Sequence, residues 1–395
     1  MDNKAITDKI ETINNQISTA KNEARSLYTE IESVKTKVRD GGLKENSYKI
    51  KSIPNHSINP KLYNTLEGHQ SKISQIQWNK ESDKILSGSQ DGYMIIWDAI
   101  TGYKKNIIEL DNQWLLTCSL SPSGEMIASG GLDNNLTIYK IGDQTTNRPN
   151  VNYFNSSVQY IFKGHRAYIS DSKFLNSHQI ITSSGDMKNM MWDLHKGDKV
   201  REFIDHTGDI LCLSTFNNEN NIFMSGSCDG YVKMWDVRQK SSVQNLFISN
   251  YDINTLKVFP QGKSFVSGSD DGIIRFFDLR SDCELSQYSI TSEFKNFSSE
   301  PSFGWKQDNL SSRNSLNSVS SMDSINILSV DFSRSGRLIY SCYSDFGCLI
   351  WDSLKGEIIG AIGGHLNKVN QVSVAPDGIG VCTASWDSTI KVWAP

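Results

Sequence analysis

The chain has 395 residues, of which 37% are hydrophobic and 10% aromatic, so it can bury a large core. Its formal net charge of −4 and its pI near 6.0 argue against nucleic-acid binding, which usually requires a basic surface. Seven cysteines without a Cys-x-x-Cys pair favour a reduced, intracellular protein over a disulfide framework.

The first residues are polar and charged, and no run of eighteen apolar residues occurs, so the sequence predicts neither a signal peptide nor a membrane span. The chain ends in Val392-Trp393-Ala394-Pro395, without a cysteine that could be prenylated. We therefore expect a cytoplasmic protein whose attachment to any membrane depends on a partner.

Residues 1–40 are predicted to form a helix with a narrow apolar seam. Apolar residues recur at alternating spacings of four and three, which is a heptad pattern, until Gly41-Gly42 end it. Such a helix is unstable alone in water. It could fold back on the rest of the chain, but so narrow a stripe favours a coiled coil with a partner helix. The seam residues are Ile6, Ile10, Ile13, Ile17, Ala20, Ala24, Leu27, Ile31, Val34 and Val38.

Residues 41–60, with Pro54 and Pro60, are predicted to be a linker. From residue 61 to 395, short apolar runs alternate with Ser, Gly, Asp and Asn, which is typical of strands and tight turns. An aspartate followed six residues later by an aromatic recurs seven times, and four of the six intervals are 42 or 43 residues, the length of four short strands. The chain is therefore expected to be an all-β, seven-bladed β-propeller. The pairs are Asp91/Trp97, Asp133/Tyr139, Asp186/Trp192, Asp229/Trp235, Asp271/Phe277, Asp345/Trp351 and Asp387/Trp393.

Histidines precede several of these pairs at near-equal distance, as in Gly68-His69, Gly164-His165 and Gly364-His365. This spacing resembles the WD-repeat signature. The resemblance implies a hydrogen-bonded tetrad of histidine, hydroxyl, aspartate and tryptophan, with Ser87 or Ser89 as the hydroxyl in the first repeat and Thr383 or Ser385 in the last. The histidine and tryptophan members would be His69, His165, His206 and His365 with Trp97, Trp192, Trp235 and Trp393, paired with Asp91, Asp186, Asp229 and Asp387.

The second and fifth repeats lack a histidine at this place and carry Asp111-Asn112 and Ser249-Asn250, so we expect these two blades to be less tightly tied. Two insertions lengthen the repeats. One lies between Lys140 and Val158, and the other, residues 289–323, is rich in serine and is predicted to be a disordered loop. Because the chain ends near Trp393, Lys61–Leu66 is expected to supply the missing outer strand of the last blade.

No phosphate-binding loop, nucleophile elbow or metal-ligand cluster is present, so we expect no enzymatic activity, no cofactor and no metal. Function on such a scaffold usually lies in the loops of one face, at positions that differ between equivalent repeats. The residue before each turn aspartate is such a position. Leu132 and Trp386 there, beside Trp114-Leu115-Leu116 and Tyr168, predict an apolar protein-binding patch, although single members could instead fill the central channel.

The chain is further similar to heterotrimeric G protein beta subunits along nearly its whole length. The resemblance is carried by Gln90-Asp91-Gly92, Gly130-Gly131-Leu132-Asp133-Asn134, Ile181 to Asp186, Trp235-Asp236-Val237-Arg238, Phe277-Asp278-Leu279-Arg280 and Gly336-Arg337-Leu338, and by a heptad helix that leads into seven WD repeats. It implies a gamma subunit that pairs with the helix and carries the lipid anchor to the inner face of the plasma membrane. It also implies a GDP-bound alpha subunit, and later effectors, on the narrow face.

The contact residues that this resemblance implies are Lys72, Trp114, Leu115, Leu116, Leu132, Asn134, Tyr168, Asp209, Leu211, Cys228, Asp252, Asn254, Asp270 and Trp386. The sequence departs from the family at Gln70 and Ser74, at Leu115-Leu116, and in the insertion at 289–323. These departures bear on the choice and strength of partners rather than on where the site lies.

Two other functions fit the repeats. Trp235-Asp236-x-Arg238 and Phe277-Asp278-x-Arg280 fit a short pattern of WD-repeat substrate receptors of cullin ubiquitin ligases, although both also occur in G protein beta subunits. A scaffold with a self-associating coiled coil also fits the heptads. Ligase receptors have no need of the heptad helix, which favours the G protein interpretation.

Overall fold

The computed structural model describes residues 13, 15–27, 29–30, 53, 58, 60–142, 156–216, 219–290 and 325–394. The chain divides into two units, Met1–Lys51 and Ser52–Pro395. The insertion between Lys140 and Val158 lies mostly, and the one at 289–323 almost wholly, outside the described residues, as does most of the linker at 41–60.

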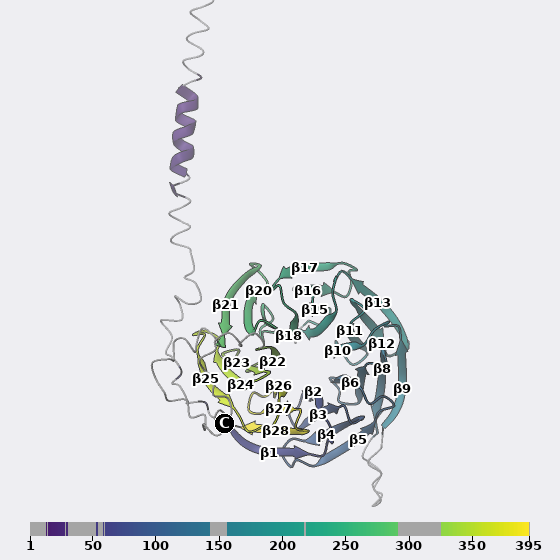
Figure 1. The fold of residues 1–395 in the computed structure, drawn as a ribbon. Helices are drawn as coiled ribbons and strands as arrows, with labels where there is room; N and C mark the ends of the chain where they lie inside the picture. The colour runs from purple at the N-terminus through teal and green to yellow at the C-terminus, as the bar shows by residue number, and fades with distance from the viewer. Residues whose placement is uncertain are drawn as a thin grey trace, which may run out of the picture. The chain divides into compact units, whose positions relative to one another are not determined.

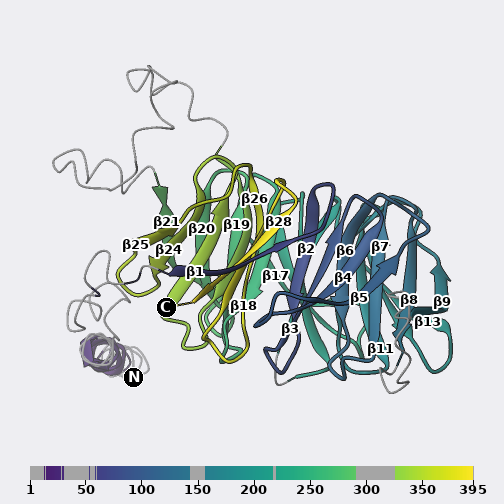
Figure 2. The ribbon, with the colours of Figure 1, turned by 90° about the horizontal axis from the view of Figure 1, so that it is seen from below.

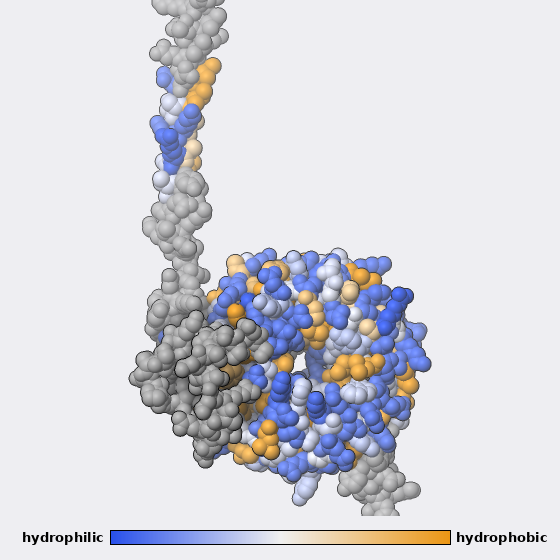
Figure 3. All heavy atoms as spheres, viewed as in Figure 1, coloured by the Kyte–Doolittle hydropathy of each residue, from blue (hydrophilic) through white to orange (hydrophobic). Residues whose placement is uncertain are grey.

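In the first unit, residues 15–27 are helical, as the heptad pattern predicts. All of them are exposed, including the seam residues Ile17, Ala20 and Ala24, and Ile13 and Leu27 are 53% and 57% exposed. Figure 3 shows hydrophobic residues gathered along one side of this helix and hydrophilic ones along the other. The remaining seam residues, Ile6, Ile10, Ile31, Val34 and Val38, lie outside the described residues. Within the described part of the chain, no helix is long and apolar enough to cross a membrane.

The second unit is a closed ring of seven four-stranded antiparallel sheets, which confirms the predicted propeller (Figure 1). The first blade contains β2 (Ile73–Trp78), β3 (Lys84–Ser89), β4 (Tyr93–Asp98) and β5 (Lys104–Glu109). The second contains β6 (Leu115–Leu120), β7 (Met126–Gly131), β8 (Asn135–Ile141) and β9 (Ser156–Lys163). The third contains β10 (Ile169–Phe174), β11 (Gln179–Ser184), β12 (Lys188–Asp193) and β13 (Asp198–Ile204).

The remaining blades repeat this order. The fourth contains β14 (Ile210–Thr215), β15 (Ile222–Ser227), β16 (Tyr231–Asp236) and β17 (Ser242–Phe247). The fifth contains β18 (Ile253–Val258), β19 (Ser264–Ser269), β20 (Ile273–Asp278) and β21 (Cys283–Ser289). The sixth contains β22 (Ile327–Phe332), β23 (Leu338–Tyr343), β24 (Gly347–Asp352) and β25 (Ile358–Ile362), and the seventh contains β26 (Val369–Val374), β27 (Val381–Ser385) and β28 (Thr389–Ala394).

The outer strand of the seventh blade is β1 (Lys61–Glu67), which pairs antiparallel with β28 from Lys61–Ala394 to Glu67–Thr389. The two ends of the propeller segment therefore close the ring, as the short C-terminus predicted. Figure 1 shows β2, β6, β10, β18, β22 and β26 nearest the axis, and β1, β5, β9, β13, β17, β21 and β25 at the rim. Figure 2 shows the blades edge-on, standing side by side.

Among the described residues, the hydrophobic core is divided into seven clusters, each built by two neighbouring blades. For example, Trp97 of the first blade packs in one cluster with Ile390 and Val392 of the seventh. A second cluster joins Leu86 of the first blade to Cys118 and Ile127 of the second. Each blade therefore buries its apolar faces only against its neighbours, which explains why the ring must close to be stable.

The turn between the second and third strands of each blade requires a left-handed backbone. The residue after the aspartate has positive φ at Gly92, Gly230 and Gly272, and also at Asn134 (62°), Met187 (65°) and Ser388 (64°). Glycine adopts this conformation without strain, which explains its recurrence after the turn aspartate. The sixth blade places its positive φ one residue later, at Gly347.

Candidate functional site

The repeated histidine, aspartate, hydroxyl and tryptophan form one connected network in the first blade. His69 Nδ1 lies 2.9 Å from Asp91 Oδ2, and His69 Nε2 lies 2.8 Å from Ser87 Oγ. Trp97 Nε1 donates to the same Ser87 oxygen at 2.8 Å. Since a carboxylate can only accept, Nδ1 carries the proton and donates to Asp91. Of the two hydroxyls considered, Ser87 is the one that joins the network.

The same geometry recurs in the third, fourth and seventh blades. The hydroxyl that bridges histidine and tryptophan is Thr182, Ser225 and Thr383, with histidine contacts of 2.7–2.9 Å. Burial by itself would raise the pKa of Asp229, but the hydrogen bond and charge of His206, with two backbone N–H groups, lower it to about 2. The pKa of Asp387 is likewise lowered to about 2. These side chains are buried and fully engaged with each other, so they hold the blade together.

The fifth blade has no histidine but is tied by a different residue, which corrects the expectation of a looser blade. Arg275 Nη2 donates to Asp271 Oδ2 at 2.6 Å, and Arg275 Nη1 donates to Ser269 Oγ at 2.9 Å. Both charged side chains are only 11–12% exposed. The guanidinium therefore takes over the contact with the turn aspartate that an imidazole makes elsewhere.

A second repeated contact places the variable residues in pairs. In every blade, the N–H of the residue before the turn aspartate donates to the carbonyl of the residue that precedes the innermost strand, at 2.9–3.1 Å. Because all blades share one topology, the seven pairs form a ring at one end of the propeller, which we call the paired ring. Its members are Gln90/Lys72, Leu132/Trp114, Gly185/Tyr168, Cys228/Asp209, Asp270/Asp252, Ser344/Asn326 and Trp386/Lys368.

The paired ring is followed by a β-bulge in the innermost strand of every blade. The register shifts just after the first strand residue, for example between Ile73 and Gln75, so one residue is left unpaired. A bulge redirects a side chain without ending the sheet. The bulge residues, all half-buried, are Ser74, Leu116, Ser170, Leu211, Asn254, Leu328 and Asn370.

Cations surround the aromatic member of the paired ring in the seventh blade. Lys72 Nζ lies 3.9 Å from the centre of the Trp386 ring, and Lys368 Nζ lies 5.4 Å from it. A cation over an indole face is attracted by the negative face of the ring. Lys72 comes from the first blade, so this cluster spans the interface where the propeller closes.

Apolar groups continue the paired ring in the second blade. Trp114 and Leu132 are 58% and 51% exposed, and Leu132 N–H donates to the Trp114 carbonyl at 3.1 Å. Exposed aromatic and aliphatic side chains that adjoin each other are typical of protein-binding surfaces. Figure 3, viewed down the propeller, shows a largely hydrophilic end with hydrophobic patches beside the central opening.

Carboxylates dominate the opposite part of the paired ring. Tyr168 donates its hydroxyl to Asp209 at 2.9 Å, and burial together with this bond raises the tyrosine pKa to about 12. Burial, with Asp252 and other nearby carboxylates, raises the pKa of the Cys228 thiol to about 12. The Cys228 thiol is therefore neutral at physiological pH and is not a nucleophile. In the same part of the ring, Asn254 donates to Asp270 and, at 3.0 Å, to the carbonyl of Ile327.

Gly185 of the paired ring must be a glycine for a steric reason. A Cβ on Gly185 would lie 2.5 Å from the Tyr168 ring. The tyrosine therefore lies directly on the backbone of its paired residue, which positions its hydroxyl toward the fourth blade.

Most of the predicted contact residues belong to the paired ring or the bulges, and two do not. Leu115 is 3% exposed and belongs to the core between the first two blades, so it is not a surface contact residue; as the first residue of β6 it points inward. Asn134 follows the turn aspartate and takes the left-handed conformation. Its Nδ2 donates to the carbonyl of Arg166 at 3.4 Å.

The sequence analysis missed several residues at these positions, among them Lys368 and Asn326 of the paired ring and the bulge residue Asn370. Their positions relative to the turn aspartates would have identified them, since Lys368 precedes its innermost strand as Lys72 does. Two of the departures from the family, Ser74 and Gln70, also have defined contacts. Ser74 Oγ donates to the Leu115 carbonyl at 2.6 Å, and the backbone N–H of exposed Gln70 donates to Asp91 at 2.9 Å.

Comparison with known proteins agrees with this architecture. The family described as G protein beta WD-40 repeat protein matches residues 14–301, and the family described as WD domain, G-beta repeat matches residues 315–352 and 356–394. A guanine nucleotide-binding protein subunit beta of Saccharomyces cerevisiae is 42% identical over 404 residues, which cover 100% of this chain and 93% of the relative. The protein of that name from Dictyostelium discoideum is 36% identical over 97% of this chain and 99% of its own length. The one from Oryza sativa subsp. japonica is 34% identical over 84% and 82%.

Proposed function

The chain belongs to the G protein beta family of WD-40 repeat proteins, and we propose that it acts as the non-catalytic beta subunit of a heterotrimer. In this role it pairs with a gamma subunit, holds a GDP-bound alpha subunit, and contacts effectors after the alpha subunit leaves. The observation that best supports the proposal is the paired ring, in which an apolar and cation–aromatic part faces a carboxylate-rich part.

The paired ring is suited to a partner with mixed chemistry. Trp114, Leu132 and Trp386 offer apolar anchors, Lys72 and Lys368 can meet acidic groups, and the aspartates can meet basic ones. Complementary charge around aromatic anchors orients a partner and favours one docking geometry over others. We infer that the alpha subunit and effectors bind here, through the predicted contact residues other than Leu115.

Affinity for a GDP-bound alpha subunit tests this site. Trp386→Ala is expected to weaken binding by about 2 kcal/mol, a roughly thirtyfold loss, since it removes a central aromatic anchor and its two cation contacts. Tyr103→Ala is the matched control, because Tyr103 is 75% exposed and lies in the loop between β4 and β5, at the other end of the propeller. Equal affinity of Trp386→Ala and the unmodified chain would remove Trp386 from the site.

The apolar seam of the N-terminal helix supports pairing with a gamma subunit, which would supply the lipid that holds the complex at the inner face of the plasma membrane. Isolated exposed isoleucines on an amphipathic helix are unfavourable unless another helix covers them. Among the described residues, two isoleucines, Ile13 and Ile17, and the leucine Leu27 are large apolar side chains exposed in this way.

Recovery of a co-expressed gamma subunit tests the seam. Ile13→Glu with Ile17→Glu should abolish recovery, whereas Asn15→Glu with Thr19→Glu, on other faces of the same helix, should leave it unchanged. Deletion of residues 1–40 should match the seam variant. Undiminished recovery after the deletion would contradict the pairing.

The alternative function as a ubiquitin-ligase substrate receptor receives less support. Arg238 donates to both oxygens of Asp236, and Arg280 does the same with Asp278, at distances down to 2.5 Å. These short-range pairs explain both Asp-x-Arg patterns as turns that are stabilised locally.

A further inference from the structure

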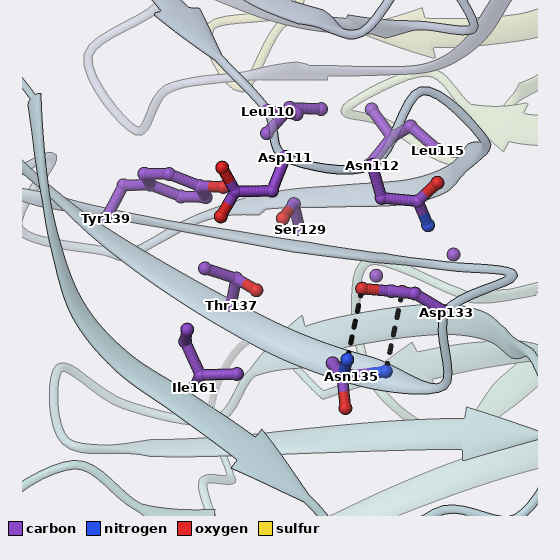
Figure 4. A pocket seen from close by; sticks show the side chains of 12 residues that line it. Leu110, Asp111, Asn112, Leu115, Ser129, Asp133, Asn135, Thr137, Tyr139 and Ile161 are labelled. Atoms are coloured by element: carbon purple, nitrogen blue, oxygen red, sulfur yellow. Dashed lines mark hydrogen bonds between the residues drawn. The ribbon is translucent and has the colours of Figure 1, made fainter.

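The second blade contains a cavity of about 100 Å³. Its polar walls are Asp111, Ser129, Asp133, Thr137 and Asn135, and its apolar walls include Tyr139 and Ile161. Figure 4 shows Asp111, Ser129 and Thr137 around the same space, with Asp133 and Asn135 at its other end. The cavity is therefore a polar one with an apolar side.

The cavity lies where other blades hold their histidine. Ser129, Asp133 and Tyr139 have the register of Ser87, Asp91 and Trp97, and Asp111 precedes Trp114 by three residues as His69 precedes Lys72. An aspartate thus replaces the imidazole, and its shorter side chain does not fill the space. The second blade has retained the acceptors of the tetrad without its nitrogen donor.

The acceptors around the cavity have unused capacity. Asp91 Oδ2 accepts from the imidazole and from the N–H of Gln70, both at 2.9 Å. Among the described residues, Asp133 accepts only from Asn135, twice at 3.4 Å. Thr137 is 8% exposed, and its hydroxyl makes no hydrogen bond within the described part of the chain. Asp133 and Asp111 are exposed, so solvent can satisfy their free acceptor positions, whereas the buried Thr137 hydroxyl has no partner in the described structure. Buried polar groups normally have partners, so the Thr137 hydroxyl in the cavity wall indicates room for a ligand.

The fifth blade shows which kind of group can contact the turn aspartate when the histidine is absent. There the turn aspartate is met by a guanidinium, from Arg275, four residues after Asp271. The corresponding residue of the second blade is Thr137, four residues after Asp133, which is too short to reach it. In five of the seven blades, therefore, a planar nitrogen group of this chain contacts the turn aspartate.

We propose that the second-blade cavity binds a small planar nitrogen cation of imidazolium or guanidinium chemistry. Its N–H groups would donate to Asp133 and to Asp111 or the hydroxyls of Ser129 and Thr137, and its flat face would pack against Tyr139 and Ile161. A cavity of about 150 Å³ holds benzene, so this smaller one suits a five-membered ring or a single guanidinium group. The two carboxylates supply the negative field that a cation needs; they also contribute, after burial, to a Tyr139 pKa of about 12.

The direct test titrates the full-length protein with methylguanidinium and with its neutral isostere methylurea, while methyl resonances of Leu110, Leu115 and Ile161 are followed by NMR. Methylguanidinium should give saturable shifts with Kd on the order of 1 mM, and methylurea should bind at least tenfold more weakly. Imidazole should bind more tightly at pH 6, where it is protonated, than at pH 8.5. Equal affinity for the cation and its neutral isostere, or no saturable shift at all, would overturn the proposal.

Substitutions at Thr137 give a second test that does not depend on the probe. Thr137→Arg should imitate Arg275, fill the cavity from within, and abolish binding of methylguanidinium. Thr137→Val keeps the volume but removes the hydroxyl, and should weaken binding only severalfold. Unchanged binding by Thr137→Arg would show that the cation sits elsewhere.

The same chemistry could come from a free small molecule or from an arginine of a partner protein. A capped Ala-Arg-Ala peptide distinguishes these sources. If it competes with methylguanidinium at similar concentration, the mouth of the cavity admits a side chain of a partner. If it does not compete while methylguanidinium binds, the ligand is a free cation.

Discussion

The first and second blades have the same four-stranded sheet and the same turn aspartate, yet differ at two positions of the hydrogen-bond network, where Asp111 and Tyr139 replace a histidine and a tryptophan. In the first blade, His69 joins Asp91 to Ser87 and fills the space between them. In the second, Asp111 stands at that place and a cavity remains. The fifth blade lacks the histidine too, but Arg275 replaces its contact. The blade fold therefore tolerates loss of the tetrad, and the group that occupies the place of the histidine differs from blade to blade.

Arg275→Thr should give the fifth blade the same missing contact at its turn aspartate as the second blade has. Of the substitutions considered for stability, it should have the largest effect. It leaves Asp271, only 12% exposed, without its cation, so we expect a loss of about 3 kcal/mol in the free energy of unfolding. Urea unfolding of the full chain measures it. Arg238→Thr is the control, because the Arg238 side chain is 70% exposed and should contribute less than 1 kcal/mol. Similar losses for the two variants would contradict this account of the fifth blade.

Ser87→Ala and Ser129→Ala remove the same hydroxyl from a complete and an incomplete network. Ser87→Ala leaves the Trp97 N–H and His69 Nε2 without a buried partner, so we expect a loss of about 2 kcal/mol. Ser129→Ala, in a blade where the hydroxyl meets the Tyr139 phenol but no histidine or tryptophan, should lose only about 1 kcal/mol. Chemical unfolding of both variants provides the measurement, and equal losses would show that the tetrad adds no stability beyond its single bonds.

The third blade has a complete tetrad, yet one of its buried residues, Asn189, is unfavourable for stability. It is fully buried in the third blade, and both polar atoms of its side chain lack partners. The equivalent residues of the other blades are all buried and apolar: Met94, Leu136, Val232, Ile274, Cys348 and Ile390. Asn189→Val should therefore raise the free energy of unfolding by about 1.5 kcal/mol. A lower melting temperature would mean that the amide has a partner such as buried water.

Acid should weaken the complete blades through their aspartates. The folded-state pKa of Asp229 is about 2, below its ordinary value of 3.8, so the stability it provides is fully present above pH 4–5 and is lost as the pH falls toward 2. Asp229→Asn should reduce the loss of stability between pH 4 and pH 2 by about 1 kcal/mol, compared with each protein's own value at pH 7. An identical acid dependence of the two proteins would exclude Asp229 as a contributor.

Burial lowers the pKa of a histidine, whereas it raises that of an aspartate, yet His365 also makes the protein less stable in acid. Burial lowers the pKa of His365 below its ordinary value near 6.5, despite the hydrogen bond from its ring to Asp387. The unfolded chain then takes up a proton first as the pH falls below 6.5, so this residue also removes stability on acidification.

Several features could be predicted from the sequence because they depend on local spacing. The interval from each turn aspartate to its aromatic predicted the strands, and the short C-terminus predicted that β1 completes the seventh blade. The members of the paired ring and of the bulges could be predicted only in part. Leu115 looked like a surface residue because it follows Trp114, but the innermost strand turns it into the core. Lys368 was missed because its contact, Trp386, belongs to a turn eighteen residues away.

The number of blades, the heptad helix and the family could be predicted from the sequence alone, since each follows from residues at fixed short intervals. Which side chains share a site depends on the tertiary structure. Lys72 meets Trp386, and Gln75 meets Asp171, because ring closure and blade packing bring distant segments together. It likewise decided that Arg275 fills the place of a histidine whereas Thr137 leaves a cavity, since side-chain length counts only once the surrounding walls are in position.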